Sequence, residues 1–389
     1  MCELKVYKLG DACTELSDGL HKAPIFVEGG DYIFVNAKNI AKGFIVDNDP
    51  TKKSTKEEYL KYSSPLNETT ILYSIDGTIG NIALYRGEKC ILGKGACYMN
   101  PNPQILDRMY LYYTLQSPHF NAYIDQMSTG STIQHISLKT MRNYVFTCPP
   151  LDEQKQIASV LSSLDDKIDL LNRENATLEA MAETLFRQWF IEDAKEDWEE
   201  GKLGDILSVK GGTTPSTKES RYWDGDIAWT SPRDITTLNG IYLFKTEKTI
   251  TEAGLKQISS GLLPKGTLLM SSRAPVGVLA FAEIPLAINQ GYIAILDDKG
   301  YAKEFIYLWL KANMDLVHSY SNGSTFMEIS KSAFKSLDIT IPSQKEVSDF
   351  VTMIKPYFDK IKLNEEQIIL ITKQRDILLP KLMSNEINI

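Results

Sequence analysis

The chain repeats itself once along its length, and this repeat limits what it can fold into more than any other feature. Three segments recur in the same order, with shifts of 194, 195 and 193 residues: KLGD (8–11 and 202–205), GDYIFVNAKNI and GDIAWTSPRDI (30–40 and 225–235), and STGSTIQHIS and SNGSTFMEIS (128–137 and 321–330). Such a period is too long for a solenoid, whose repeats have about 20–50 residues. Each copy is therefore expected to be a whole domain followed by a connector.

The first ~140 residues of each copy are expected to mix strands and helices. TTILYSI (69–75) and GTLLMSS (266–272) are short apolar runs that typify strands bounded by turn residues. DRMYLYYTLQS (107–117) and AKEFIYLWLKAN (302–313) space their large apolar residues as a helix does. These patterns predict an α+β domain in each copy.

The end of each copy has a different pattern, in which apolar residues recur at alternating steps of four and three. The first set is Ile157, Leu161, Leu164, Ile168, Leu171, Asn175, Leu178, Ala182, Leu185 and Trp189. The second set is Phe350, Ile354, Tyr357, Ile361, Asn364, Ile368, Ile371, Arg375, Leu378 and Leu382. A sustained 3.5-residue period predicts a coiled-coil seam. We expect the two long helices to pair antiparallel, which would give the chain an approximate two-fold symmetry.

Three residues interrupt this pattern. Asn175 and Asn364 occupy seam positions, where a buried Asn fixes register at a cost in stability. The alternative is that one or both lie in a frayed or solvated stretch. Pro356 is expected to kink the second helix or to mark a late start.

The motifs of several enzyme classes are missing from the sequence. CPPL (148–151) has neither the polar residue before nor the aromatic residue after the two prolines that an adenine methyltransferase needs. GGTTPSTK (211–218) lacks the second Gly of an ATP phosphate loop. The five cysteines form no CxxC pair, and the four histidines have no metal-ligand spacing. We therefore expect no catalysis, no cofactor and no metal in this chain, and free thiols in a reducing cytoplasm.

The net charge of −8 opposes nucleic-acid binding at face value, but it comes from one segment. Residues 151–200 carry 14 acidic and 5 basic residues, whereas 1–150 carry 15 of each. The acidic segment is expected to face away from DNA as part of a partner-binding rod, or to be an ordinary solvated helix face. No apolar run reaches the ~20 residues of a membrane span.

The repeated blocks also contain the motifs of a known protein family. These are PPLDEQKQIASVLSSLDDKI (149–168), GDIAWTSPRDI, GGTTPS (211–216), the paired GST loops and ILLPKLMSNEI (377–387). In their order and duplication the chain resembles the specificity subunit of type I restriction-modification systems. The resemblance implies a first target-recognition domain (1–150), a first conserved spacer helix (151–195), a second target-recognition domain (196–342) and a second spacer helix (343–389).

The resemblance also implies a function and partners. A subunit of this kind reads a bipartite, asymmetric double-stranded DNA target. It joins two adenine methyltransferase subunits and, in the full complex, endonuclease subunits. S-adenosylmethionine and ATP are then expected on the partner subunits. Two alternatives stay open: a specificity subunit of a related restriction-methylation system with different partners, or an adaptor that binds only proteins.

Candidate DNA contacts are side chains in loops that can donate to phosphates or form forked hydrogen bonds with base edges. In the first copy they are His21, Lys22, Asn36, Lys38, Asn39, Ser131, Thr132 and Gln134. In the second copy they are Thr213, Thr214, Lys218, Arg221, Ser231, Arg233, Arg273, Asn289, Gln290, Ser324 and Thr325. The competing interpretation is that these polar residues only satisfy turns, and that Tyr222, Trp223 and Trp229 belong to the core. The two copies differ where VNAKNI (35–40) meets TSPRDI (230–235) and where SIDGTIG (74–80) meets SSRAPVG (271–277), as domains reading different words would.

Overall fold

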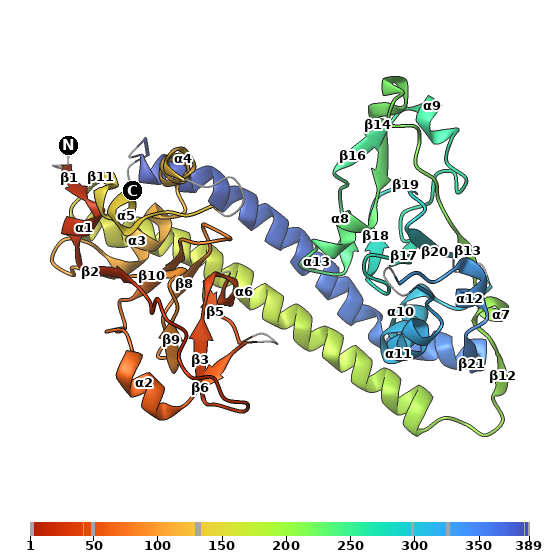
Figure 1. Ribbon diagram of the computed structural model, residues 1–389. Helices are drawn as coiled ribbons and strands as arrows, with labels where there is room; N and C mark the ends of the chain where they lie inside the picture. The colour runs from red at the N-terminus through yellow and green to blue at the C-terminus, as the bar shows by residue number, and fades with distance from the viewer. Residues whose placement is uncertain are drawn as a thin grey trace. The chain divides into compact units, whose positions relative to one another are not determined.

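The structure is a computed structural model that describes residues 4–41, 43–47, 51–128, 134–296, 299–323, 327–384 and 386–387. It forms two compact units (Figure 1). The first contains Met1–Ile168 and Leu370–Ile389, and the second contains Asp169–Ile369. Both divisions fall inside a long helix, so each unit combines one strand-rich domain with a portion of both long helices. Within the described ranges, no helix has the length and apolar character that crossing a membrane requires.

The described residues of the first unit form four small sheets. They are the antiparallel pair β1 (Lys5–Lys8) and β11 (Val145–Cys148); the antiparallel sheet β2 (Cys13–Asp18), β10 (Ala96–Pro101), β7 (Ile71–Ser74) and β8 (Ile82–Leu84); the sheet β6 (Lys53–Ser54), β3 (Tyr32–Val35) and β9 (Cys90–Leu92); and the pair β4 (Ile40–Ala41) and β5 (Phe44–Ile45). In the third of these, β3 runs parallel to β9 and antiparallel to β6.

Three sheets are present in the part of the second unit that the structure describes. They are the antiparallel pair β12 (Glu199–Lys202) and β21 (Asp338–Ile341); the sheet β13 (Ser208–Lys210), β20 (Tyr292–Leu296), β17 (Leu268–Ser271), β18 (Leu279–Ala282) and β15 (Tyr242–Leu243); and the sheet β16 (Lys248–Ile250), β14 (Trp223–Thr230) and β19 (Leu286–Ile288). Here β14 runs parallel to β19 and antiparallel to β16.

The two domains share one topology. The order β2-β10-β7-β8 in the first matches β13-β20-β17-β18 in the second, and β6-β3-β9 matches β16-β14-β19 with the same strand directions. The predicted strands at 69–75 and 266–272 are the equivalent strands β7 and β17. The internal repeat of the sequence is therefore a repeat of the fold.

Short helices connect and flank these sheets. In the first unit they are α1 (Leu9–Ala12), η1 (Ala37–Asn39), α2 (Lys56–Tyr62), α3 (Arg108–Thr114), α4 (Pro118–Met127) and α5 (Leu138–Asn143). In the second they are η2 (Gln188–Glu192), α7 (Leu203–Ile206), η3 (Ser220–Tyr222), α8 (Pro232–Thr236), α9 (Glu252–Leu255), α10 (Lys303–Ala312), α11 (Met314–Ser319) and α12 (Lys331–Lys335). The helices predicted at 107–117 and 302–313 are α3 and α10.

The serine that ends each GST block starts the next helix. The Ser137 hydroxyl oxygen accepts a hydrogen bond from the Thr140 N–H at the start of α5, and the Ser330 hydroxyl oxygen accepts one from Ala333 at the start of α12. Each hydroxyl satisfies an N–H group that has no partner inside the helix, which stabilises the helix by about 1 kcal/mol. The repeated sequence thus repeats a helix cap.

The two long helices are α6 (Leu151–Arg187) and α13 (Gln344–Met383), and both carry the predicted seam (Figure 1). None of the twenty seam residues is exposed. Within the first unit Arg375 meets Asp165, and Leu382 shares a core with Ile157. Within the second, Asn364 meets Asn175 and Phe350 meets Phe186. In each unit the residue number falls along α13 as it rises along α6, so the helices pair antiparallel. The helix α13 begins well before Pro356, so the expectation of a late start there is wrong.

Both long helices belong to the core of the second unit. Phe186 of α6 and Phe350 of α13 are buried with their rings 6.1 Å apart, and Phe305 of α10 packs on Phe186. Burying one such side chain stabilises the fold by roughly 1.5–3 kcal/mol. The seam therefore holds the helices to each other and to the domain that they carry.

Candidate nucleic-acid interface

In each domain a glycine lets a loop lie against the end of a strand. A Cβ atom on Gly19 would lie 2.2 Å from the carbonyl oxygen of Leu92, and one on Gly212 would lie 1.7 Å from that of Ile288. Leu92 and Ile288 end the equivalent strands β9 and β19. Only glycine fits at such distances, so Gly212, the second glycine of GGTTPS, is explained by backbone packing.

A second segment follows the neighbouring parallel strand in each domain. The Asn36 N–H donates to Oδ1 of Asn39 over 3.1 Å, and the Ser231 N–H donates to Oδ2 of Asp234 over 2.9 Å. Both pairs cap a short helix, η1 or α8. Asn39 is buried, and its amide also donates to Val46 O and Thr51 Oγ1. The side chain of Asn39 is therefore buried and hydrogen-bonded within the fold, which argues against a direct DNA contact.

The turn after β7 is built like the turn after β17. The Ser74 hydroxyl donates to Thr78 O and accepts from the Asn81 N–H. The Ser271 hydroxyl donates to Pro275 O and accepts from the Val278 N–H, at 2.6 and 2.9 Å. The positive φ angles of Gly77 and Gly80 recur at Ala274 and Gly277. The turns 74–81 and 271–278 therefore share one frame although their sequences differ.

A third segment joins each of these turns. Ile136 donates its N–H to Ile75 O, and Ile329 donates its N–H to Ser272 O, at 2.9 and 3.0 Å. Isolated antiparallel bridges beside these bonds pair Asp76 with His135 and Arg273 with Glu328. We define the first corner as residues 36–39, 74–81, 93–95 and 134–136. The second corner is residues 231–234, 271–278, 289–291 and 327–329.

The first corner brings several predicted contacts together. Asn81 donates to Ala37 O over 3.3 Å, and Gly77 donates to Gln134 O over 3.1 Å, so half-buried Asn36, exposed Lys38 and exposed Gln134 share this surface. Ser131 and Thr132 lie outside the described residues.

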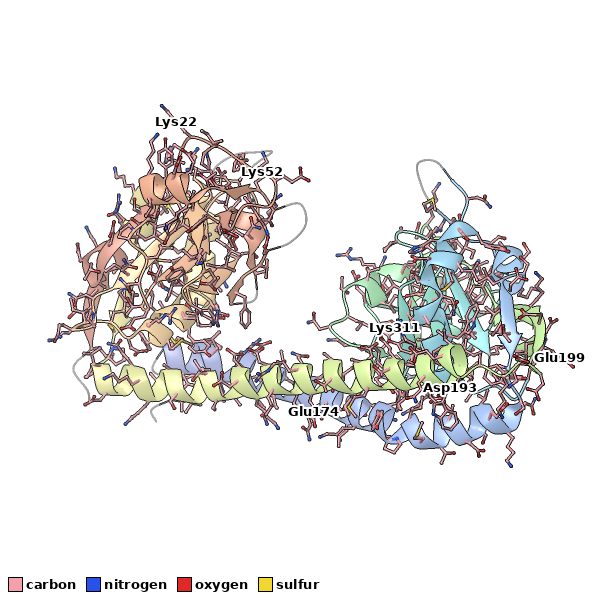
Figure 2. The ribbon with its side chains drawn as sticks, turned by 90° about the horizontal axis from the view of Figure 1, so that it is seen from below. Lys22, Lys52, Glu174, Asp193, Glu199 and Lys311 are labelled. Carbon is pink, nitrogen blue, oxygen red and sulfur yellow. The ribbon has the colours of Figure 1, made fainter. Side chains whose placement is uncertain are left out.

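His21 and Lys22 lie beside the first corner, since Leu20 bonds to Leu92 and Lys94. Both are exposed, and His21 Nε2 lies 2.9 Å from Asp18 Oδ2. In Figure 2, Lys22 and Lys52 lie on the side of the first unit opposite to its portion of α6.

The second corner gathers Ser231, Arg233, Arg273, Asn289 and Gln290. Exposed Gln290 accepts the Thr214 hydroxyl through Oε1 at 2.7 Å, and Asn289 Oδ1 accepts the Gly291 N–H at 2.8 Å. These bonds orient both amides, so the Nδ2 and Nε2 groups remain as donors.

The buried phenol of Tyr292 supports the backbone of the second corner. Tyr292 donates from its hydroxyl to Ser231 O over 2.6 Å. Burial raises the pKa of Tyr292, which keeps the phenol protonated as a donor.

Other predicted contacts of the second domain lie away from its corner or outside the described residues. Half-buried Thr213 donates to Gln257 O, so its hydroxyl serves the fold. Arg221 is exposed on η3, 3.3 Å from Glu219, and Lys218 is exposed. Ser324 and Thr325 are not among the residues that the structure describes.

The structure adds residues that the sequence reasoning did not nominate. Asp76, His135 and Glu328 lie in the corners, next to nominated positions. A signal for Asp76 was present, because aligning SIDGTIG with SSRAPVG places Asp76 opposite Arg273.

The large aromatic residues of the second domain support the core interpretation. Trp229 is buried and meets Trp223 edge-to-face at 5.0 Å between ring centroids. The ring of Trp229 is therefore part of the core, while Trp223 is half-buried beside it.

Part of the acidity of α6 is neutralised within the second unit. Lys311 of α10 pairs with Glu179 and Glu183 at 2.7 and 2.6 Å, and Lys360 of α13 lies 3.5 Å from Glu174 (Figure 2). These acidic residues therefore hold α6 to α10 and α13. Neither sequence-based interpretation, a partner-binding rod or a solvated helix face, included this role.

The corners offer hydrogen-bond donors and acceptors of the kinds that read DNA, with no arrangement for metal chemistry. Across the described ranges, no group of three or more His, Cys, Asp or Glu side chains is placed to hold a metal ion. Lysine, arginine and amide groups on connected loops suit phosphate and base-edge contacts.

The fold and its duplicated corners agree with the comparison to protein families. Residues 1–180 and 195–373 match the type I restriction modification DNA specificity domain. The chain belongs to this family and carries two copies of its domain. Family membership confirms the predicted class, a DNA-specificity subunit instead of a catalytic one.

Two relatives show the extent of the likeness. The chain is 38% identical over 198 residues to the MjaIX specificity subunit of Methanocaldococcus jannaschii, which covers 50% of this chain and 44% of that protein. It is 21% identical to the HindI specificity subunit of Haemophilus influenzae, with 100% of both chains covered. The first alignment thus spans less than half of that relative's length.

A solved structure confirms the fold. The S subunit of a type I restriction-modification system from M. genitalium superposes with a TM-score of 0.60 at 18% identity, covering 98% of this chain and 96% of that one. This likeness supports the predicted α+β architecture of two domains and two long helices.

Proposed function

We propose that this chain reads a bipartite, asymmetric DNA target for a type I restriction-modification complex, with each corner contributing to the reading of one word. The observation that carries the proposal is the pair of corners, in which one hydrogen-bonded frame presents different side chains. A shared frame with different side chains is what two readers of different words require.

The proposal includes partners and cofactors. The chain joins two adenine methyltransferase subunits, and endonuclease subunits in the full complex, and these partners carry the S-adenosylmethionine and the ATP. Its support is the family match, together with the missing methyltransferase and phosphate-loop motifs. A cytoplasmic location belongs to the same proposal, in line with the four cysteines that the structure describes as free thiols.

The test is an exchange of domains. Residues 1–150 are replaced by those of a relative, the complex is assembled with its methyltransferase partners, and methylated adenines are mapped by sequencing. One word should change and the other should persist. The matched exchange of residues 196–342 should change only the second word, and a change of both words in either exchange would refute independent reading.

The same preparation separates the alternatives. A protein-only adaptor predicts no DNA footprint from the complex of this chain with methyltransferase subunits. A related system with different partners predicts a footprint but no assembly with such subunits. The purified chain alone, mixed with S-adenosylmethionine and DNA, should transfer no methyl groups.

A further inference from the structure

Equivalent positions in the two corners carry side chains of opposite charge. Asp76 is the second residue after Ser74 in its turn, and Arg273 is the second residue after Ser271 in the equivalent turn. Opposite them, the bridge partners are His135 and Glu328. The acidic residue thus lies on the turn in the first corner and on the joining segment in the second.

The side chains at these positions remain accessible to a ligand. The side chains of Asp76 and His135 are 32% and 38% exposed, with His135 Nδ1 3.7 Å from Asp76 Oδ1. Arg273 is half-buried and Glu328 is exposed. The bridges themselves are made by backbone atoms. The charged end of Asp76 lies near His135 and is still partly exposed.

The change of sign identifies the kind of contact. A position that only binds phosphate needs a positive or neutral donor in both domains, because a carboxylate is repelled by the DNA backbone. The frame residues Ser74 and Ser271 are identical and make the same bonds, so the frame gives no reason for the difference. A position whose side chain differs in charge on an identical frame suits contact with a base edge, because base edges present both hydrogen-bond donors and acceptors.

We propose that Asp76 and Arg273 are base-reading residues of the two words. The guanidinium of Arg273 donates two hydrogen bonds to O6 and N7 of a guanine, and the carboxylate of Asp76 accepts from the N4 amino group of a cytosine. The second word therefore contains a guanine and the first a cytosine where these turns meet DNA. This inference rests on the proposed function and specifies two side chains that give the DNA reading its base selectivity.

The test uses the full chain in complex with its methyltransferase subunits and a DNA library with randomised base pairs. The variant Arg273→Gln should lower the preference for guanine at one base pair of one word by about 5- to 150-fold. The other word should be unchanged. The variant Arg273→Lys keeps the charge but loses the fork, so it should keep general DNA affinity and lose most of the guanine preference.

Arg187→Gln is the matched control, since Arg187 is exposed on α6 in the same unit and takes no part in the corner. It should keep every base preference. The variant Asp76→Asn tests the first unit separately, and it should relax the cytosine preference in the other word only. Thermal unfolding of each variant shows whether the fold is kept. If one of Arg273→Gln and Asp76→Asn disrupts its own turn, the other variant still tests the inference in the other unit.

The outcomes are distinguishable. An equal loss of affinity for all sequences on Arg273→Gln identifies a phosphate contact and overturns the inference. Unchanged words in both Arg273→Gln and Asp76→Asn overturn it too. A wild-type complex without any preferred word refutes the proposed function itself, and the inference with it.

Discussion

Asn364 on α13 donates a hydrogen bond from Nδ2 to Oδ1 of Asn175 on α6, over 2.8 Å. The same amide group donates to Glu174 Oε2 over 2.9 Å, and Asn364 is fully buried. Its own Oδ1 is buried without a hydrogen-bond partner among the described residues. The pair is therefore unfavourable compared with an apolar one, but the hydrogen bonds from Nδ2 form at one alignment of the two helices. Asn364 is buried and Asn175 is half-buried within continuous helices, so neither lies in a frayed stretch. That the pair fixes the register stays a prediction.

The double variant Asn175→Leu with Asn364→Leu should unfold at higher urea concentration than the wild type. The expected gain is about 1–4 kcal/mol, because two apolar side chains replace a polar pair with one unsatisfied atom. The variant Asn364→Asp should lose stability, since it places a second carboxylate beside Glu174. A double variant less stable than wild type would show that the hydrogen bonds contribute more than apolar packing.

Adjacent serines in the second corner should respond in opposite ways to replacement by alanine. Ser271 makes two hydrogen bonds with its hydroxyl, whereas the Ser272 hydroxyl is buried and has no hydrogen-bond partner in the described chain. Ser272→Ala should stabilise the fold by up to about 1 kcal/mol, and Ser271→Ala should destabilise it by about 1–3 kcal/mol. Chemical denaturation of the two variants gives both values, and the same sign for both would contradict the assignment.

The long helices could be predicted from sequence because their signal is local and periodic. All seam positions are shielded, including Arg375, whose polar side chain the period alone did not explain. The late start expected at Pro356 was wrong because a missing backbone donor is a local cost, whereas the apolar face around it gains from tertiary packing: Phe350, Ile354 and Phe358 are all buried. A kink at Pro356 stays a prediction.

The corners were harder to predict, since the difference between a DNA contact and a cap depends on the path of the backbone. Lys38 and Asn39 are neighbours with suitable chemistry, yet Lys38 is exposed and Asn39 is buried as a capping residue. The equivalence of Asp76 and Arg273 was hard to predict because each lies on a turn that pairs with a segment distant in the sequence. Aligning the two copies gives these positions, but only the frame shows that they are equivalent.

Arg375 interrupts the apolar seam because it meets a partner across the helices. Its Nη1 lies 2.8 Å from Asp165 Oδ1, and the buried Tyr113 hydroxyl donates to Asp165 Oδ2 over 2.8 Å. The variant Asp165→Ala should cost about 2–3 kcal/mol, because it leaves the phenol without this acceptor and leaves Arg375 with Asp376 alone, on its own helix. Asp165→Asn keeps an acceptor for Tyr113 and should cost less. Equal losses measured by urea unfolding would mean that only the ion pair matters.

The last prediction concerns Glu365 of α13, which accepts two backbone N–H groups of the second domain. Its Oε1 lies 2.8 Å from Ile241 N and its Oε2 3.1 Å from Tyr242 N. Gly240 leaves room for it, since a Cβ there would lie 2.3 Å from the carboxyl carbon. Burial raises the pKa of Glu365 to about 7; the two N–H groups oppose this effect, and the carboxylates of Glu179 and Glu283 add to it.

Because its folded pKa is higher than the ordinary value of 4.5, native Glu365 keeps a proton that the unfolded chain loses between pH 4.5 and about 7. Its contribution to stability is therefore complete below pH 4.5 and is lost as the pH rises to about 7, by up to ~3 kcal/mol. Glu365→Gln should remove this part of the pH dependence, at the cost of one backbone hydrogen bond. Glu366→Gln, at the exposed neighbour, should keep it. Free energies of unfolding at pH 5 and pH 8 decide the matter: an equal decrease in wild type and Glu365→Gln would show that the burial of this carboxyl does not control the pH response.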